Sequence, residues 1–293
     1  MIQNELFPKP AEEGIVNVAS VKQLSPFRYP GGKTWLVPRA RKWLKSKSNA
    51  PDFFIEPFAG GGIISLTVAA EGLAQKVVMA EFDGDIASVW WAIITGDAEW
   101  LAQKILDFKL DSRNVREILD TAPRSVRERA FRTILQNRVS HGGIMAPGSG
   151  LIKNGENDRG LASRWYPSTL AKRIRAISTF RHKIVFIEGD AFDVIRSYQQ
   201  HANTFFFIDP PYTAGNGKRA GRRLYKHNLI DHPALFDLMS SIQGDFLMTY
   251  DNNDEIVRLA QAKAFKHKAV AMKNTHHAVL SELLIGRDLS WDN

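Results

Sequence analysis

The chain of 293 residues contains no cysteine, which excludes disulfide bonds, thiolate metal sites and a thiol nucleophile. It has no apolar run near the roughly 18 residues that a membrane-spanning helix needs. Residues 1–20 lack the basic and then apolar order of a secretion signal. The eight histidines show no metal-ligand spacing. We therefore expect a cytoplasmic protein with no membrane partner and no bound metal.

Positive charge is concentrated in one part of the chain. The net charge is +8, and residues 111–181 alone hold fourteen Lys/Arg and six Asp/Glu, which leaves 25 of each sign in the other 222 residues. A local basic excess is typical of a surface that binds nucleic acid. The alternative is a solvated helical surface.

Short apolar runs alternate with amphipathic stretches along most of the chain. The runs are rich in Phe, Ile and Val and mostly end in acidic or turn residues, which indicates strands buried on both faces. The predicted strands lie in 52–58, 76–83, 183–190, 204–212, 245–252, 267–272 and 278–286. Helical patterns lie between most of them, so the sequence predicts an α/β fold with a doubly wound, mostly parallel sheet.

The alternation stops between about residues 97 and 180, where Arg-rich helical stretches and a Gly-rich loop replace it. We interpret residues 97–180 as an inserted helical lobe. The division that follows is a leader of residues 1–24, a sheet domain formed by 25–96 and 181–293, and the insert between its two parts.

The strongest chemical signal is Asp209-Pro210-Pro211-Tyr212, which directly follows an apolar run. The two prolines make a rigid loop. An aromatic amine is a poor nucleophile because its lone pair is delocalised into the ring. Asp209 and the Pro210 carbonyl can accept both amine hydrogens and so favour a tetrahedral nitrogen, while Tyr212 offers a flat face for a stacked base. The alternative is a Pro-Pro turn that closes a buried strand.

A glycine-rich turn follows the first predicted strand. Residues 56–62 read Glu-Pro-Phe-Ala-Gly-Gly-Gly, and they include Glu56, Phe58, Gly60 and Gly62. Glycines at a strand-to-helix turn let a ligand approach the backbone closely. The spacing is not GxGxxG, which argues against a dinucleotide site.

Acidic residues end the next two predicted strands. Glu81 stands where a carboxylate can accept hydrogen bonds from ribose hydroxyls. Asp83 is either a second ligand or the cap of the following helix. Asp190 either accepts a hydrogen bond from an adenine amine or caps its own helix.

These motifs together resemble the Dam-like adenine-specific DNA methyltransferases. The family order is an aromatic/Pro-Gly-Gly-Lys motif, the Gly-rich turn, a target-recognition insert and then Asp-Pro-Pro-Tyr. The chain has this order, with Phe-Arg-Tyr-Pro-Gly-Gly-Lys at 27–33, and the resemblance covers most of residues 25–286. Glu56 and Glu81 stand where the family more often has aspartate.

The resemblance implies a methyltransferase fold with seven strands, the last antiparallel, and a target-recognition role for the insert. It implies transfer of a methyl group from S-adenosylmethionine to N6 of an adenine flipped out of duplex DNA, in a bacterial or phage-infected cell. The recognition sequence, the oligomeric state and a cognate restriction endonuclease stay open. The candidate cofactor-binding residues are Tyr29, Lys33, Glu56, Phe58, Gly60, Gly62, Glu81, Asp190 and Asp209.

Candidate DNA contacts come from the insert and from a basic stretch after the Asp-Pro-Pro-Tyr motif. In the insert, Arg124 and Arg132 can contact phosphates, and Asn137 and Arg138 can read base edges. The basic stretch can clamp phosphates around a flipped base, or it is a solvated loop. Its candidates are Lys218, Arg222 and Arg223.

Other activities are weaker alternatives. Methylation of N4 of cytosine uses the same amine chemistry but more often has Ser in place of the motif's Asp. C5 methylation of cytosine proceeds through a cysteine adduct, which this chain cannot form. Methylation of RNA adenine or of a protein amide, and a non-catalytic DNA-binding relic, complete the alternatives.

Overall fold

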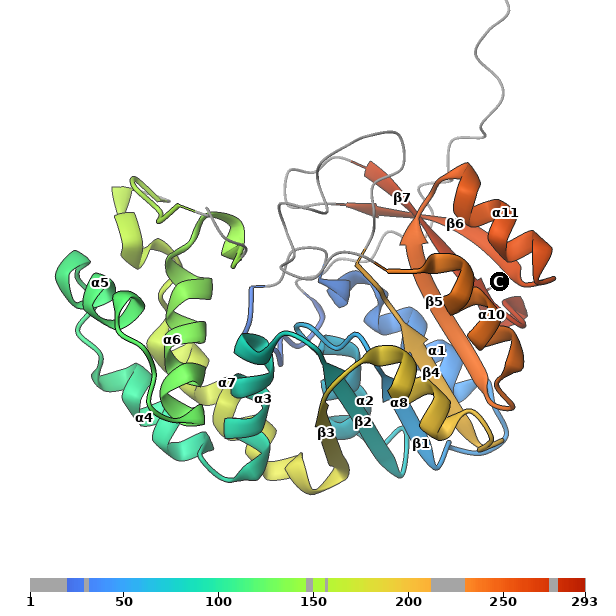
Figure 1. The fold of residues 1–293 in the computed structure, drawn as a ribbon, viewed down its shortest axis with the longest axis horizontal. Coiled ribbons are helices and arrows are strands. Elements are labelled where there is room, and N and C mark those ends of the chain that lie inside the picture. Colours follow the sequence, from blue (N-terminus) through green and yellow to red (C-terminus); the bar gives the residue numbers. More distant parts are fainter. Residues whose placement is uncertain are drawn as a thin grey trace, which may run out of the picture.

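The computed structural model describes residues 20–28, 32–145, 150–155, 158–211, 230–273 and 279–292. Its centre is one seven-stranded sheet with the strand order β3-β2-β1-β4-β5-β7-β6 (Figure 1). The strands are β1 (Phe53–Glu56), β2 (Lys76–Glu81), β3 (Ile184–Glu188), β4 (Thr204–Ile208), β5 (Asp245–Asp251), β6 (Lys266–Lys273) and β7 (Val279–Gly286). The seven strands predicted from the apolar runs are therefore confirmed.

The sheet is parallel except at β7, which pairs antiparallel with both β5 and β6. The expected antiparallel last strand is thus confirmed, and it lies between β5 and β6. The chain moves outward from β1 to β2 and β3, and then crosses to β4 on the other side of β1. Such a reversal of strand order opens a crevice at the carboxyl ends of the two central strands, β1 and β4.

Helices cover both faces of the sheet, which explains why the strands are continuously apolar. Alternate strand residues enter two separate apolar clusters: Phe54 and Phe207 join one, and Ile55 and Ile208 join the other. The first face is covered by η2 (Lys33–Leu36), α1 (Val37–Lys45), α2 (Ile63–Glu71) and α3 (Gly84–Thr95), and the second by α8 (Ala191–Tyr198), α10 (His232–Ser241) and α11 (Asp254–Ala262). None of the helices that the structure describes is long and apolar enough to cross a membrane.

Helices α4 to α7 stand between α3 and β3 and form the lobe on the left of Figure 1. Their bounds are α4 (Ala98–Asp107), α5 (Ser112–Asp120), α6 (Val126–Val139) and α7 (Pro167–Phe180). The side chains of Asp111 and Ser125 cap α5 and α6 through the backbone N–H groups of Asn114 and Glu128. Buried side chains of all four helices join the same apolar cluster as α3. The lobe is therefore packed onto the sheet domain and not tethered beside it.

The predicted leader ends earlier than residue 24. Val21 and Leu24 are only 5% and 4% exposed and belong to the apolar cluster on the α1 side of the sheet. Burial of two aliphatic side chains ties this segment to the core. Residues 1–19 lie outside the described part of the chain.

Gly62, at the start of α2, has no room for a side chain. Its φ is +61°, and a Cβ at this position would lie 2.5 Å from Cε of Met79 and 3.2 Å from the Trp90 ring. The Gly62→Ala variant should lose about 2–3 kcal/mol of unfolding free energy, because it combines backbone strain with overpacking. Urea unfolding measures this loss. Gly150→Ala is the control, since a Cβ at residue 150 would meet no atom of the described residues within 4 Å and the backbone there is not left-handed. An equally stable Gly62→Ala protein would contradict this packing.

Candidate active site

Three neighbouring strands bring the predicted site residues together at one edge of the sheet. Glu81 ends β2, the glycine-rich turn follows β1, and Asp209 follows β4. Because β2, β1 and β4 are adjacent and parallel, their carboxyl ends meet. This edge is where doubly wound sheets bind ligands.

The Asp209 carboxylate is held by two side chains from other elements. Its Oδ1 atom accepts a 2.8 Å hydrogen bond from Thr249 of β5 and lies 3.1 Å from Nζ of Lys33 in η2. The Asp209 side chain is 21% exposed, whereas Lys33 is 4% exposed. Lys33 thus lies behind the catalytic candidate, on its protein side. Pro210 is buried and Pro211 half-buried, while Tyr212 lies outside the described residues.

Lys33 also contacts a second carboxylate. Its Nζ lies 3.1 Å from Oε2 and 3.4 Å from Oε1 of Glu282 on β7. Burial disfavours the Lys33 ammonium, but the attraction of Asp209 and Glu282 outweighs it, so the pKa of Lys33 is raised. Burial, reinforced by the charges of Asp209 and Asp251, raises the pKa of Glu282 to about 7 against the opposing effect of Lys33. Burial also raises the pKa of Asp251.

The glycine-rich turn is tied to the end of β2 by Glu81. Its Oε2 accepts a 2.9 Å hydrogen bond from the Gly60 N–H, and its Oε1 accepts one of 2.9 Å from the Asp83 N–H. The Gly60 carbonyl in turn accepts a 3.0 Å bond from Nε1 of Trp90. Burial raises the pKa of Glu81 to about 7 although these backbone bonds favour the carboxylate. With φ of +46° at Gly60 and +61° at Gly62, the turn adopts a backbone that favours glycine.

Glu56 points into the protein at the end of β1. It is 4% exposed, and its Oε2 accepts a 2.9 Å hydrogen bond from the Ser65 N–H in the first turn of α2. Burial raises the pKa of Glu56 to about 8. Phe58 is half-buried and packs against the apolar cluster on the α8 side of the sheet.

The two aspartates with alternative roles both act as helix caps. Asp83 accepts a 2.9 Å hydrogen bond from the Asp85 N–H at the start of α3. Asp190 accepts a 2.8 Å bond from the Phe192 N–H at the start of α8. Each cap bond uses only Oδ1 of the carboxylate, so capping does not conflict with a ligand role for the same side chain. The ligand role of Asp190 stays a prediction.

Asn137 and Arg138 do not lie where base-reading residues would have to lie. Asn137 is 1% exposed, and its amide bonds to Arg28 N, Arg28 O and Gly143 O at 2.8, 2.8 and 2.9 Å. Arg138 is 4% exposed and donates to the Pro26 carbonyl. The expectation that these two side chains reach base edges is therefore wrong for this structure, because they join the insert to the segment before η2.

The remaining DNA-contact candidates fall into two groups. Arg124 is exposed, and Arg132 is half-buried with its guanidinium donating to the Leu119 carbonyl at 3.2 and 2.9 Å. Lys218, Arg222 and Arg223, like the cofactor candidate Tyr29, lie outside the described residues.

Four arginines gather where the insert meets the segment before η2. Burial and then the charges of Arg173 and Arg28 lower the pKa of Arg138 to about 9, and Arg164 acts in the same direction. Nε of Arg138 and Nη1 of Arg28 are buried and have no hydrogen-bond partner among the residues that the structure describes. Arg173 donates a 2.9 Å bond to the Ser25 carbonyl. Guanidinium groups that crowd together in this way favour an anion beside them.

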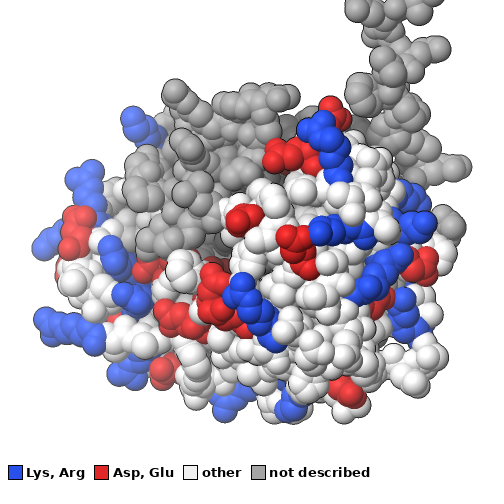
Figure 2. All heavy atoms as spheres, turned by 45° about the vertical axis from the view of Figure 1, so that its right-hand side comes forward, with Lys and Arg blue, Asp and Glu red and all other residues white. Residues whose placement is uncertain are grey.

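Acidic side chains gather at the middle of the face shown in Figure 2. Lys and Arg side chains lie along its left margin, the side on which helices α4 to α7 lie in Figure 1, and also over its right-hand part.

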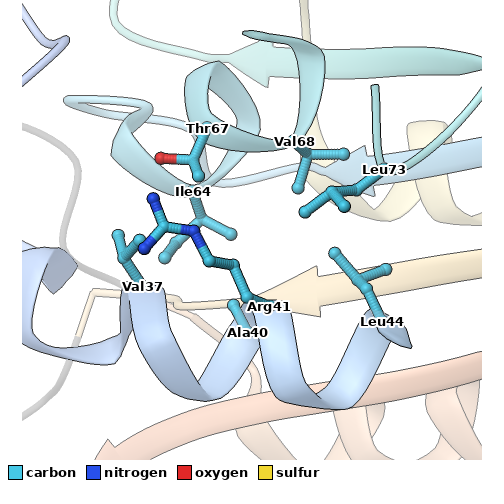
Figure 3. A pocket seen from close by; sticks show the side chains of 8 residues that line it. All are labelled: Val37, Ala40, Arg41, Leu44, Ile64, Thr67, Val68 and Leu73. Atoms are coloured by element: carbon cyan, nitrogen blue, oxygen red, sulfur yellow. The ribbon is translucent and has the colours of Figure 1, made fainter. Parts of the chain in front are cut away.

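A small depression between α1 and α2 is not part of this site. Apolar side chains from the two helices face one another across it, with Arg41 at its margin (Figure 3). Arg41 is paired with Glu71 through contacts of 2.5 to 3.0 Å. The lining is Val37, Ala40, Arg41, Leu44, Ile64, Thr67, Val68 and Leu73, and it offers no converging polar groups.

Three residues at this edge were not predicted from the sequence. Phe82 is 56% exposed between Glu81 and Asp83, and an exposed aromatic ring at a strand end is a signal for stacking. Glu282 is the only charged residue within the predicted strand 278–286, and that position could have revealed it. Thr249 carries no such signal because one hydroxyl in a buried strand is common.

The architecture and this edge define the class of the protein. A doubly wound sheet with a single antiparallel strand between β5 and β6, and a glycine-rich turn beside an acidic strand end, are the features expected of an S-adenosylmethionine-dependent methyltransferase. A family model described as D12 class N6 adenine-specific DNA methyltransferase matches residues 29–275, and the chain belongs to this family. The expected family of adenine-specific DNA methyltransferases is thereby confirmed.

Comparison with solved structures gives distant similarities. A Pyrococcus horikoshii protein described as a putative RNA methyltransferase is 11% identical, with a TM-score of 0.40 and 92% of each chain covered. A precorrin-6y C5,15-methyltransferase from Geobacter metallireducens is 9% identical, with a TM-score of 0.33 and 85% of each chain covered. A search of the curated proteins found no match.

The buried Glu56 carboxyl should make stability depend on pH. Its pKa is about 8 in the folded chain and near the ordinary 4.5 in the unfolded chain, so the folded state holds a proton that the unfolded state releases. The stabilisation is complete below about pH 4.5 and is lost as pH rises through about 8. Glu56→Gln removes this dependence, and the gain over wild type at pH 9 should be on the order of 2–4 kcal/mol.

Urea unfolding between pH 5 and pH 9 measures this difference. Glu117→Gln, at an exposed position on α5, is the matched control and should follow the wild-type profile. Parallel pH profiles for the Glu56→Gln and wild-type proteins would contradict the burial of a neutral carboxyl here.

Proposed function

We propose that this adenine-specific DNA methyltransferase transfers the methyl group of S-adenosylmethionine to N6 of an adenine that has left the duplex. The observation that carries the proposal is the Asp209 carboxylate, anchored by Lys33 and Thr249 next to the glycine-rich turn. A hydrogen-bond acceptor for the amine and a turn that admits a ligand are thus adjacent at one sheet edge.

The residues at this edge fit S-adenosylmethionine, which when bound supplies an electrophilic methyl group on a sulfonium. Gly60 and Gly62 leave the turn without side chains, so the methionine part can lie against the backbone. Glu81 is placed to accept from ribose hydroxyls, and the exposed ring of Phe82 offers a stacking face for adenine. The further proposed contacts of the cofactor pocket are Tyr29, Phe58, Asp190 and Asp209, while the buried Lys33 and Glu56 support the pocket from the protein side.

The protein's part in the chemistry is to prepare the amine. Asp209 and the Pro210 carbonyl accept the two N6 hydrogens, which turns the nitrogen lone pair out of the ring and towards the methyl group. After transfer, the nitrogen carries a positive charge and loses one hydrogen as a proton, which Asp209 is placed to receive. Pro211 keeps the loop rigid, and Tyr212 stacks on the base. Positioning and exclusion of water supply most of the rate.

The target adenine has to leave the base stack before this geometry can form. An amine inside a duplex cannot reach a carboxylate at the edge of a sheet, so the enzyme extrudes the nucleotide at a cost of a few kcal/mol. Phosphate contacts around the extruded base offset this cost. We assign these contacts to Arg124, Arg132 and Arg173 in the insert, and to Lys218, Arg222 and Arg223.

Replacing Asp209 tests the chemical assignment. Asp209→Asn keeps the size of the side chain but removes the negative charge, so kcat should fall by about 100-fold or more. Radiolabelled methyl transfer to duplex DNA measures kcat, and gel-shift titration should show retained DNA binding. Asp193→Asn, which changes an exposed aspartate paired with Arg196, is the control. Near-normal transfer by Asp209→Asn would remove Asp209 from the mechanism.

Sequencing of DNA from cells that express the protein, with detection of modified bases, tests the substrate. It should report N6-methyladenine at one sequence motif, and that motif would show which restriction endonuclease specificity the enzyme blocks. Unmodified adenine throughout would contradict the proposed function.

Arg173 tests the DNA contact of the insert. Arg173→Gln should weaken binding to all duplex sequences alike and lower the slope of log Kd against log salt by about 1, because one phosphate contact is lost. Arg175→Gln is the matched control, since Arg175 lies on the same helix but pairs with Glu99 at 2.6 and 2.9 Å. An unchanged salt slope in Arg173→Gln would place the phosphate contacts elsewhere.

A further inference from the structure

We propose that Glu282 of β7 and Thr249 of β5 are positioning residues for methyl transfer, which together with Lys33 fix the orientation and the charge of the Asp209 carboxylate. This inference rests on the function proposed above. It adds two residues that touch neither substrate nor cofactor: Thr249 acts directly on Asp209, and Glu282 acts on it through Lys33.

The geometry begins at one atom. Both the Thr249 hydroxyl and the Lys33 ammonium contact Oδ1 of Asp209, at 2.8 and 3.1 Å. Two contacts from different elements, β5 and η2, fix the plane of the carboxylate, because rotation about χ2 would break both. A near-attack geometry requires such a fixed orientation.

Glu282 sets how strongly Lys33 neutralises Asp209. The ammonium lies 3.1 Å from a carboxylate oxygen of each residue, so its positive charge is shared between them. Without Glu282, the full charge of Lys33 would act on Asp209 and withdraw electron density from it. A weaker acceptor would orient the amine less well.

A purely structural reason for these residues is weak. Thr249 is fully buried, and Lys33 and Glu282 are each 4% exposed in a region of apolar strands. Burying two charges costs solvation that apolar side chains of the same size avoid, and replacing buried ion pairs by apolar residues is often neutral or stabilising. The charged groups of Lys33 and Glu282 lie next to Asp209, at the end of β4. This placement points to a role in the reaction.

Three charged groups of the described residues act on Glu282. They are Lys33 of η2, Asp209 after β4, and Asp251, its partner across the β5–β7 pair. Its partner on β6 is Val270, which has no charge. Three carboxylates and one ammonium cannot all be ionised at low cost, which agrees with the raised pKa of Glu282, about 7. The ionised form, present above this pH, is the one that shares Lys33.

The Thr249 variants separate the hydroxyl from packing. Thr249→Val keeps the shape but loses the donor, so kcat should fall by about 10-fold, the effect of one hydrogen bond to a charged group. Thr249→Ser keeps the donor and loses a methyl group, so it should keep kcat within about two-fold even though it is the less tightly packed variant. Equal kcat for the Val and wild-type proteins, or a loss in Ser as large as in Val, would overturn the role of the hydroxyl.

The Glu282→Gln variant tests charge sharing. At pH 8 its kcat should be about 10-fold below wild type, with KM for DNA and for S-adenosylmethionine within about two-fold. The wild-type kcat should rise with pH through about 7, and this inflection should be missing in Glu282→Gln. Glu81 has a similarly raised pKa, so only the inflection that disappears in the variant belongs to Glu282. A variant profile identical to wild type would overturn the proposal.

Two further measurements separate misfolding of a variant, failure of the proposed function and failure of this inference. Circular dichroism and thermal unfolding identify any variant that has not folded, and the Thr249 pair then carries the test by itself. The wild-type protein is assayed in the same experiment on duplex DNA. Failure of the wild type to methylate adenine contradicts the proposed function, whereas an active wild type with unaffected Thr249→Val and Glu282→Gln variants contradicts only this inference.

Discussion

The buried ammonium of Lys33 is the interaction on which the arrangement of the site depends. It lies 3.1 Å from Asp209, which follows β4, and 3.1 Å from Glu282 on β7. It therefore joins η2, which precedes the first strand, to the end of β4 and to β7. A buried ammonium is stable only while a carboxylate lies beside it, and here Asp209 and Glu282 both do. The same contacts that keep Lys33 in the core keep Asp209 in one orientation.

The glycine-rich turn is held in a similar way. Glu81 accepts hydrogen bonds from the N–H groups of Gly60 and Asp83, and Trp90 of α3 donates to the Gly60 carbonyl. The turn after β1 is thus fixed by the end of β2 and by the helix that follows. Both halves of the proposed reaction centre, the turn and the Asp209 loop, are held by side chains from neighbouring elements as well as by their own backbone.

The sequence was sufficient for the strands and for the motif residues, and insufficient for residues whose partners are remote. Strands buried on both faces are continuously apolar, so all seven were visible. Asp209, Glu81 and the glycines stand at strand ends, where local order places them. Asn137 and Arg138 were misplaced because their partners, Arg28 and Pro26, lie 109 and 112 positions away. Glu282 lies 249 positions from Lys33, and no local pattern reports such a pair.

The shared core of α3 and the insert has a consequence for engineering. Helix α3 begins beside Glu81, carries Trp90, and packs on α6 of the insert. Grafting residues 97–180 from a relative would therefore change the support of the turn as well as the surface that we propose contacts DNA. An exchange of this lobe has to transplant α3 along with it, so that the hybrid keeps a matched interface behind the glycine-rich turn.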